Sequence, residues 1–230
     1  MKTKISILIA AVLCLVSCDL DKKPLSQLSP DSFFSTEAEL QAFSNNFYDG
    51  IFPSTEIYGE QSDLVIKLGL TNEMQSKRTI PESGSGWTWT TLRNFNTLIE
   101  YSVNCKDENV RNKYVALARF FRAYFYFDKV KQFGDVPWYD KTLGSEDPEL
   151  NRPRDSRDYV MQKMIEDIDY AIENLPASVS TFRVNKYAAL ALKAEFCLYE
   201  GTFRKYHEGH VTLTGDLALP EDAQPYTYYL

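Results

Sequence analysis

The largest set of residues able to do chemistry lies between positions 158 and 173, where five carboxylates share one stretch. Acidic side chains in that number could bind a metal ion or act as general acid and base. They are Asp158, Glu166, Asp167, Asp169 and Glu173. They lie opposite a regular apolar stripe and no partner residues converge on them, so a solvated helix face is the simpler interpretation.

Other reactive residue types are sparse. The two histidines, His207 and His210, are too few for a metal site, and we expect them to be exposed. Arg152, Arg154 and Arg157 form a small basic cluster that could bind an anion, although an ion-paired surface loop is the expected state. Sequence motifs of serine, cysteine, nucleotide-dependent and zinc enzymes are absent, so we expect no catalysis, no metal and no cofactor. The formal net charge of -7 argues against nucleic-acid binding.

Helices must position these residues. Apolar spacing of three and four residues predicts helices near 36–50, 89–103, 113–134, 156–175 and 185–206. Thr36 and Glu39 form a predicted capping box at the start of the first helix. Gly134 and Pro137 end the third, which should be buried on most sides. Asp155 or Ser156 can cap the fourth helix. The fold class is therefore all-α.

The N-terminus is typical of a targeting segment. A basic start is followed by an apolar run, residues 5–16, that is too short for a comfortable membrane span. The run ends in Leu15-Val16-Ser17-Cys18, which resembles a lipobox whose cysteine becomes lipidated; the alternative is an ordinary signal peptide containing a cysteine. We therefore predict a signal peptide (1–17), an extended tether (18–34) and a helical domain (35–230). Cys105 and Cys197 are expected as free buried thiols, with a disulfide possible.

The stretch from Tyr58 to Gly86 has no clear period and contains Asp63 and Arg78. A loop this long inside a compact domain is either functional or disordered. Ligand sites often use such loops on rigid scaffolds. Trp87-Thr88-Trp89 follows the loop directly and begins the next predicted helix.

Three runs of sequence resemble one known family. ARFFRAYFYFDKVKQFGDVPWY (118–139) resembles the signature helix and turn of the SusD/RagB family, WTWTTLRNFNTLIE (87–100) its second scaffold helix, and AALALKAEFCLYEGTFRKYH (188–207) a later one. The family comprises surface lipoproteins that help outer-membrane transporters take up glycans and, in some cases, peptides. The resemblance implies a tetratricopeptide-like helical superhelix with long irregular loops. It covers the N-terminal part of the family only, so the scaffold is expected to be incomplete.

The resemblance also implies a ligand site. Glycan-binding members use aromatic and polar side chains of this region, so the candidates are Asp63, Arg78, Trp87, Trp89 and Arg93. A tryptophan face would stack on a sugar ring while Asp and Arg bind hydroxyls. Taken singly, Trp89 is as easily a core residue and Arg93 a member of a surface ion pair. The family's sites also use segments beyond residue 230, so the site would be partial.

The function implied by the resemblance is nutrient binding without bond making or breaking. The protein would be anchored through lipidated Cys18 in the cell outer membrane, facing the exterior. It would bind a glycan, or a peptide, and deliver it to a SusC-like TonB-dependent transporter. Two alternatives stay open: a helical-repeat scaffold for protein contacts without small-ligand binding, and a secreted glycoside-acting enzyme. The sequence does not indicate which glycan is bound.

Overall fold

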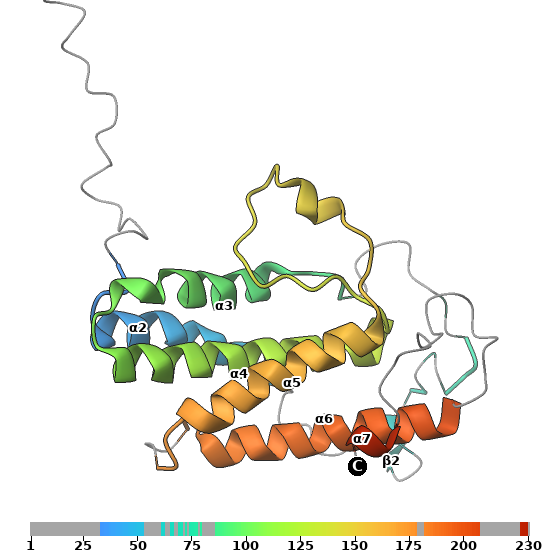
Figure 1. The fold of residues 1–230 in the computed structure, drawn as a ribbon. Helices are drawn as coiled ribbons and strands as arrows, with labels where there is room; N and C mark the ends of the chain where they lie inside the picture. Colours follow the sequence, from blue (N-terminus) through green and yellow to red (C-terminus); the bar gives the residue numbers. More distant parts are fainter. Residues whose placement is uncertain are drawn as a thin grey trace, which may run out of the picture.

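The computed structural model describes residues 33–52, 61–62, 65–66, 69–70, 72, 74–77, 79, 86–178, 182–207 and 226–229. Its helices are α2 (Glu37–Ser44), α3 (Thr90–Tyr101), α4 (Glu108–Phe133), α5 (Arg157–Asn174), α6 (Lys186–His207) and α7 (Tyr226–Tyr229). Three short 3-10 turns are η1 (Asn45–Tyr48), η2 (Ser102–Asn104) and η3 (Pro148–Asn151). The prediction of an all-α fold is confirmed (Figure 1).

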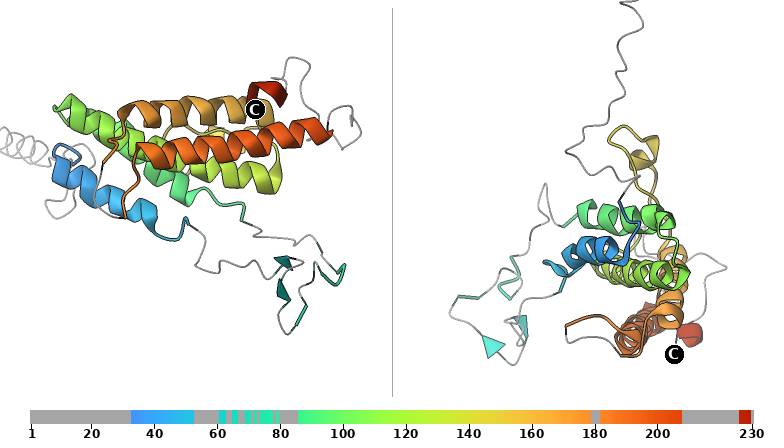
Figure 2. Two further views of the ribbon diagram at one scale, coloured as in Figure 1. Left: turned by 90° about the horizontal axis from the view of Figure 1, so that it is seen from below. Right: turned by 90° about the vertical axis from the view of Figure 1, so that its left-hand side faces the viewer.

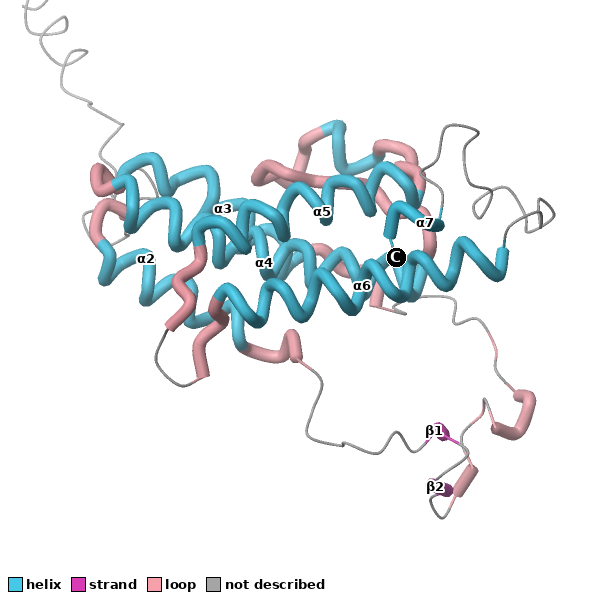
Figure 3. The backbone as a smooth tube through the Cα atoms, turned by 60° about the horizontal axis from the view of Figure 1, so that its bottom comes forward, coloured by secondary structure: helices cyan, strands magenta, loops and turns pink. Residues whose placement is uncertain are grey.

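The strands of the described residues are two antiparallel pieces of two residues each, β1 (Gln61–Ser62) and β2 (Val65–Ile66). They lie apart from the helices in Figure 3. Within the described part of the chain, none of the helices combines the length and the apolar character needed to cross a membrane.

Helix α4 is the centre of the stack. Helices α2 and α3 pack on one side of α4 and α5 packs on the other, while α6 packs against α5 and also contacts α4 (Figure 2). Three alanines of α4, Ala116, Ala118 and Ala123, are fully buried and allow this close approach. Rings of Phe47, Phe95 and Phe121 meet at 4.9 to 5.8 Å between centroids, so aromatic side chains fill the space between α2, α3 and α4. The predicted burial of this helix is thus confirmed.

The helix ends follow the cap residues. Thr36 and Glu39 make the predicted capping box at α2, and Ser156 rather than Asp155 caps α5. Helix α4 begins at Glu108, five residues before the predicted start, because the Asp107 carboxylate accepts hydrogen bonds from two free N–H groups there. Gly134 ends it with φ +72°, a value that favours glycine.

Several large apolar side chains of the helices are exposed. Val103, at the end of the predicted helix 89–103, is 65% exposed, because the chain turns into η2 before reaching it. Tyr187, Leu190 and Leu198 of α6 are 62%, 43% and 60% exposed. These three residues, spaced along one side of α6, are the outer stripe of α6.

The prediction of a solvated acidic face on α5 was wrong at two positions. Asp158 and Asp167 are only 5% and 2% exposed, because each meets an arginine from another helix. The Arg122 guanidinium donates to both oxygens of Asp167, at 2.6 and 2.7 Å. Buried carboxylates need such partners, since desolvation of an unpaired charge is costly.

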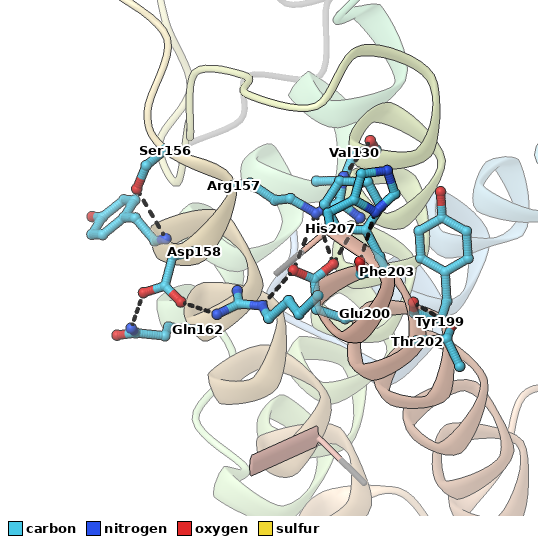
Figure 4. A network of polar contacts seen from close by, with 12 residues as sticks. Val130, Ser156, Arg157, Asp158, Gln162, Tyr199, Glu200, Thr202, Phe203 and His207 are labelled. Atoms are coloured by element: carbon cyan, nitrogen blue, oxygen red, sulfur yellow. Dashed lines mark hydrogen bonds and ion pairs between the residues drawn. The ribbon is translucent and has the colours of Figure 1, made fainter. Parts of the chain in front are cut away.

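Asp158, the other buried carboxylate of α5, belongs to a four-residue ionic cluster between α5 and α6 (Figure 4). Arg204 donates to Asp158 at 2.7 Å and to Glu200 at 2.8 Å. Arg157 binds the other side of Glu200, with its closest contact at 2.7 Å. Arg157, expected in a solvated loop, is therefore the first residue of α5 and lies in the core, where its guanidinium also stacks 3.7 Å from the Phe203 ring centroid.

Candidate ligand-binding cleft

A cleft of ≈ 540 Å³ lies between the start of α3 and the loop that joins α4 to α5. In Figure 1 this loop, which carries η3, projects from the helical stack above α5. The cleft is lined by Trp87, Trp89, Thr90, Leu92, Arg93, Asn96, Pro137, Tyr139, Lys141, Leu143, Leu150, Asn151, Arg152, Pro153 and Arg154. Its volume is that of a small-molecule site.

The two tryptophans have different environments. Trp89 is half-buried, with ring contacts to Tyr139 at 5.6 Å and Phe125 at 5.7 Å, so most of its ring serves packing. Trp87 is 37% exposed and touches the edge of Trp89 at 5.3 Å and Phe133 at 4.8 Å. Trp87 therefore offers an aromatic surface to solvent, while its neighbours limit its movement.

A lysine of α4 holds the segment that leads into these tryptophans. The ammonium of Lys129 donates to the carbonyl oxygen of Gly86 at 2.5 Å. Gly86 has φ +79°, and a Cβ at this position would lie 2.9 Å from the Gln132 side chain, so a larger residue would strain this turn. Burial lowers the pKa of Lys129. The segment that leads into α3 is therefore held in one position against α4.

The floor of the cleft is a polar connection between α3, α4 and the loop. The side-chain amide of Asn96 donates to the carbonyls of Tyr139 and Lys141, at 2.9 and 3.0 Å. Its oxygen accepts from Arg122 at 3.0 Å. The hydroxyl of Tyr126 accepts from the backbone N–H of Tyr139 at 2.6 Å and donates to a neighbouring carbonyl. These bonds fix the first part of the loop on the helices.

The two ends of the loop between α4 and α5 are joined to each other. An isolated bridge joins Val136 to Asp155, and the N–H of Trp138 donates to the Asp155 carboxylate at 2.7 Å. The N–H of Arg157 donates to the Asp135 carboxylate, also at 2.7 Å. Residues on both sides of the loop are thereby held together, so its middle part forms a stable wall of the cleft.

Four cations line the cleft, and no described residue of the lining is a carboxylate. Arg152 is paired with Asp155 at 2.9 Å and with Glu149 at 3.5 Å. The guanidinium of Arg154 lies 4.9 Å from the ring centroid of Trp87. Arg93 donates to a neutral acceptor, the carbonyl of Leu143, and Lys141 is exposed. Positive charge is therefore concentrated along the lining of the cleft.

The structure brings together three of the five predicted ligand residues, Trp87, Trp89 and Arg93, in this cleft. The other two, Asp63 and Arg78, lie outside the described residues, as does the predicted lipidation residue Cys18. The alternative of a surface ion pair for Arg93 is not observed among the described residues, since its hydrogen bond goes to a carbonyl.

Sequence reasoning missed the contribution of the loop after α4. Tyr139, Lys141 and Leu143 line the cleft. This part of the loop is held there by Asn96, which binds the carbonyl of Tyr139, 43 residues away, and that of Lys141, 45 residues away. Arg152 and Arg154 belong to the predicted basic cluster, which the sequence does not connect to the ligand site. Their proximity to the signature turn was the one signal that could have linked them to Trp87.

Groups that could hold a metal ion are absent from the described residues. His207, expected to be exposed, is half-buried because its ring stacks on Phe203 at 4.2 Å and a ring nitrogen lies 2.7 Å from the Phe203 carbonyl oxygen. His210 lies outside the described residues. Cys105 and Cys197 are free thiols, the first buried and the second half-buried.

Comparison with known proteins gives consistent matches. The SusD-like family model described as "Starch-binding associating with outer membrane" matches residues 20–198. SusD-like protein P2 of Formosa agariphila is 31% identical over 225 residues, covering 87% of this chain and 44% of the relative. A SusD-like protein of Bacteroides ovatus is 24% identical over 241 residues, covering 95% of this chain and 43% of the relative.

A solved structure supports the same relationship. The crystal structure of a SusD-like protein from Bacteroides fragilis superposes with a TM-score of 0.59 at 25% identity, covering 79% of this chain and 38% of the other. The chain thus spans less than half the length of these relatives. The matched part includes α2 to α5 and the whole of the cleft described above.

Proposed function

Because this chain belongs to the SusD-like family, whose model is described as starch-binding and associated with the outer membrane, we propose that it binds a glycan in the cleft beside Trp87. The observation that carries the proposal is the exposure of the Trp87 ring in a cleft with fixed walls. A sugar ring presents an apolar C–H face to such a surface and hydroxyls to the polar groups around it.

The polar groups of the cleft suit saccharide hydroxyls. Arg93 and Asn151 line the same cavity as Trp87 and can donate hydrogen bonds to a ligand. The amide of Asn96 is already bound to the loop, so we assign it to positioning. Trp89 supports the ring of Trp87 from the side. Asp63 and Arg78 remain predicted ligand residues that would complete the site from outside the described residues.

The wider role that we propose is glycan delivery at the cell surface. Lipidated Cys18 would anchor the protein in the outer membrane, facing the exterior, and the 18–34 segment would tether the helical domain. A SusC-like TonB-dependent transporter would receive the ligand. The family's association with the outer membrane supports this arrangement. Binding and transfer would be the whole mechanism, without catalysis.

Trp87→Ala tests the binding site. We expect glycan affinity to fall about tenfold, equivalent to about 1.4 kcal/mol, in isothermal titration against a panel of soluble oligosaccharides. Tyr187→Ala is the matched control, because it removes an exposed aromatic ring from α6, away from the cleft. Equal affinity in the wild type and in both variants would refute a site at Trp87.

Affinity capture tests the wider role. The lipidated protein, used as bait in membranes of its native host, should recover a large β-barrel transporter identified by mass spectrometry. Cys18→Ala should abolish membrane association and recovery together. Recovery of soluble proteins alone from a folded bait would argue against delivery to a transporter and favour a protein-interaction scaffold.

A further inference from the structure

The charge of the cleft differs from that of the whole protein. The chain has a formal net charge of -7, yet the described lining of the cleft contains Arg93, Lys141, Arg152 and Arg154 and no carboxylate. Arg152 is largely offset by Asp155 and Glu149, at 2.9 and 3.5 Å. A neutral sugar needs no such concentration of positive charge, because hydroxyls are bound equally well by uncharged donors.

Two of these cations lack a direct ion pair within the described structure. Arg93 and Lys141 form no ion pair with any carboxylate of the described residues, and the hydrogen bond of Arg93 goes to the carbonyl of Leu143. They come from opposite walls of the cleft, α3 and the loop. A ligand between these walls would therefore meet positive charge from both sides, in a cleft where electrostatic interaction is stronger than in open water.

The third cation, Arg154, contacts the Trp87 ring, which is the proposed stacking surface. The guanidinium of Arg154 lies 4.9 Å from the ring centroid of Trp87. The arginine thus lies over one face of the ring that we assign to sugar stacking. Guanidinium groups bind carboxylate and sulfate oxygens with two parallel hydrogen bonds. An acidic substituent on a stacked sugar would thus lie within reach of a donor suited to it.

Building on the proposed function, we propose that the cleft is selective for acidic saccharides, in which uronate carboxylates or sulfate esters supply the negative charge. Trp87 would stack on the sugar ring, and Arg93, Lys141 and Arg154 would bind the anionic group. The net negative charge of the protein would weaken the binding of a polyanion outside such a cluster of cations.

The test uses pairs of probes that differ only in charge. Oligogalacturonides are compared with their methyl esters, and dextran sulfate with dextran, by titration calorimetry with the full chain. We expect the acidic member of at least one pair to bind about tenfold more tightly in 50 mM salt, and this advantage to shrink in 500 mM salt. The two pairs distinguish a carboxylate from a sulfate as the preferred group.

Lys141→Gln is the informative variant, because Lys141 is exposed and the substitution leaves packing intact. It should weaken the acidic probe about two- to fivefold and the neutral probe much less. Lys106→Gln, which removes an exposed positive charge far from the cleft lining, should change neither. Inorganic sulfate at millimolar concentration should not displace the saccharide. Chloride at the same ionic strength is the control.

The outcomes separate the two proposals. Equal binding of acidic and neutral probes, with Trp87→Ala weakening both and Lys141→Gln neither, would overturn the acidic preference and leave glycan binding intact. Displacement by inorganic sulfate would mean that the cleft binds a small anion, which also overturns the acidic-saccharide inference. Binding that does not depend on Trp87, or no binding by any probe, would overturn both proposals.

Discussion

Replacing Glu200 by glutamine should destabilise the protein more than any other single-atom exchange in α6. Glu200 has 0% exposure and accepts hydrogen bonds from two arginines. Arg157 approaches to 2.7 Å and Arg204 to 2.8 Å (Figure 4). The cluster of Arg157, Arg204, Asp158 and Glu200 is electrically neutral as a whole. Glu200→Gln keeps the shape of the side chain and leaves one buried positive charge without compensation.

The size of the effect follows from the burial of the pair. Removing one partner of a buried ion pair typically costs about 3–5 kcal/mol, because the remaining charge stays desolvated. Asp158 still compensates Arg204 at 2.7 Å, whereas the only described carboxylate bonded to the guanidinium of Arg157 is Glu200. Arg157 cannot move to solvent easily, since its guanidinium is 3.7 Å from the Phe203 ring centroid. We therefore expect a loss of about 3 kcal/mol in the free energy of unfolding.

Urea unfolding followed by circular dichroism measures this loss. With a slope of about 2 kcal/mol per molar urea, the midpoint should fall by about 1.5 M. Glu195→Gln is the control, because it makes the same chemical change at an exposed position of the same helix; it should stay within about 0.5 kcal/mol of the wild type. A Glu200→Gln loss below about 1 kcal/mol, with an unchanged slope, would refute the assignment of the cluster as a buried, mutually dependent unit.

Three further predictions concern α2, α4 and α6. Thr36→Ala removes the capping box of α2 and should cost about 1 kcal/mol in the same urea assay, whereas Thr36→Ser should cost much less. Burial raises the pKa of Tyr126, so the native state keeps this proton above pH 10 and loses stability as pH rises further. Tyr126→Phe should lower stability at pH 7 by about 1–3 kcal/mol, through its lost hydrogen bonds, and make the alkaline loss shallower by up to about 1.4 kcal/mol per pH unit. An unchanged alkaline slope would contradict this. We expect the exposed outer stripe of α6 to cause self-association, which Leu198→Glu should reduce in sedimentation velocity without lowering the urea midpoint; a wild-type protein that stays monomeric, or association that persists unchanged in the variant, would contradict this.

Local signals in the sequence predicted the fold well. The spacing of apolar residues located the five long helices, and short-range cap residues located several of their ends. The capping box at Thr36 and Glu39 and the stop at Gly134 depend only on residues a few positions apart, so the sequence displays them directly. The first helix was still predicted too long, since its apolar spacing continues through the 3-10 turn η1.

Long-range pairing is what the sequence could not display. Asp158 and Asp167 were assigned to solvent because their partners, Arg204 and Arg122, lie 46 and 45 residues away. The same limitation applies to the cleft. Trp87, Trp89 and Arg93 were found from one local stretch, whereas the loop residues opposite them are brought there by the bond between Asn96 and the carbonyl of Tyr139, 43 residues apart.

The closed base of the loop after α4 has a consequence for how this scaffold can diversify. Because the bridge between Val136 and Asp155 fixes both ends, the segment between them can change in length without disturbing α4 or α5. The entropic cost of such a change is small, about 0.6 kcal/mol for each doubling of a flexible loop. Insertions and deletions in this loop can therefore change the shape of the cleft wall that it forms. New ligand preferences could arise there while the aromatic core between the helices stays the same.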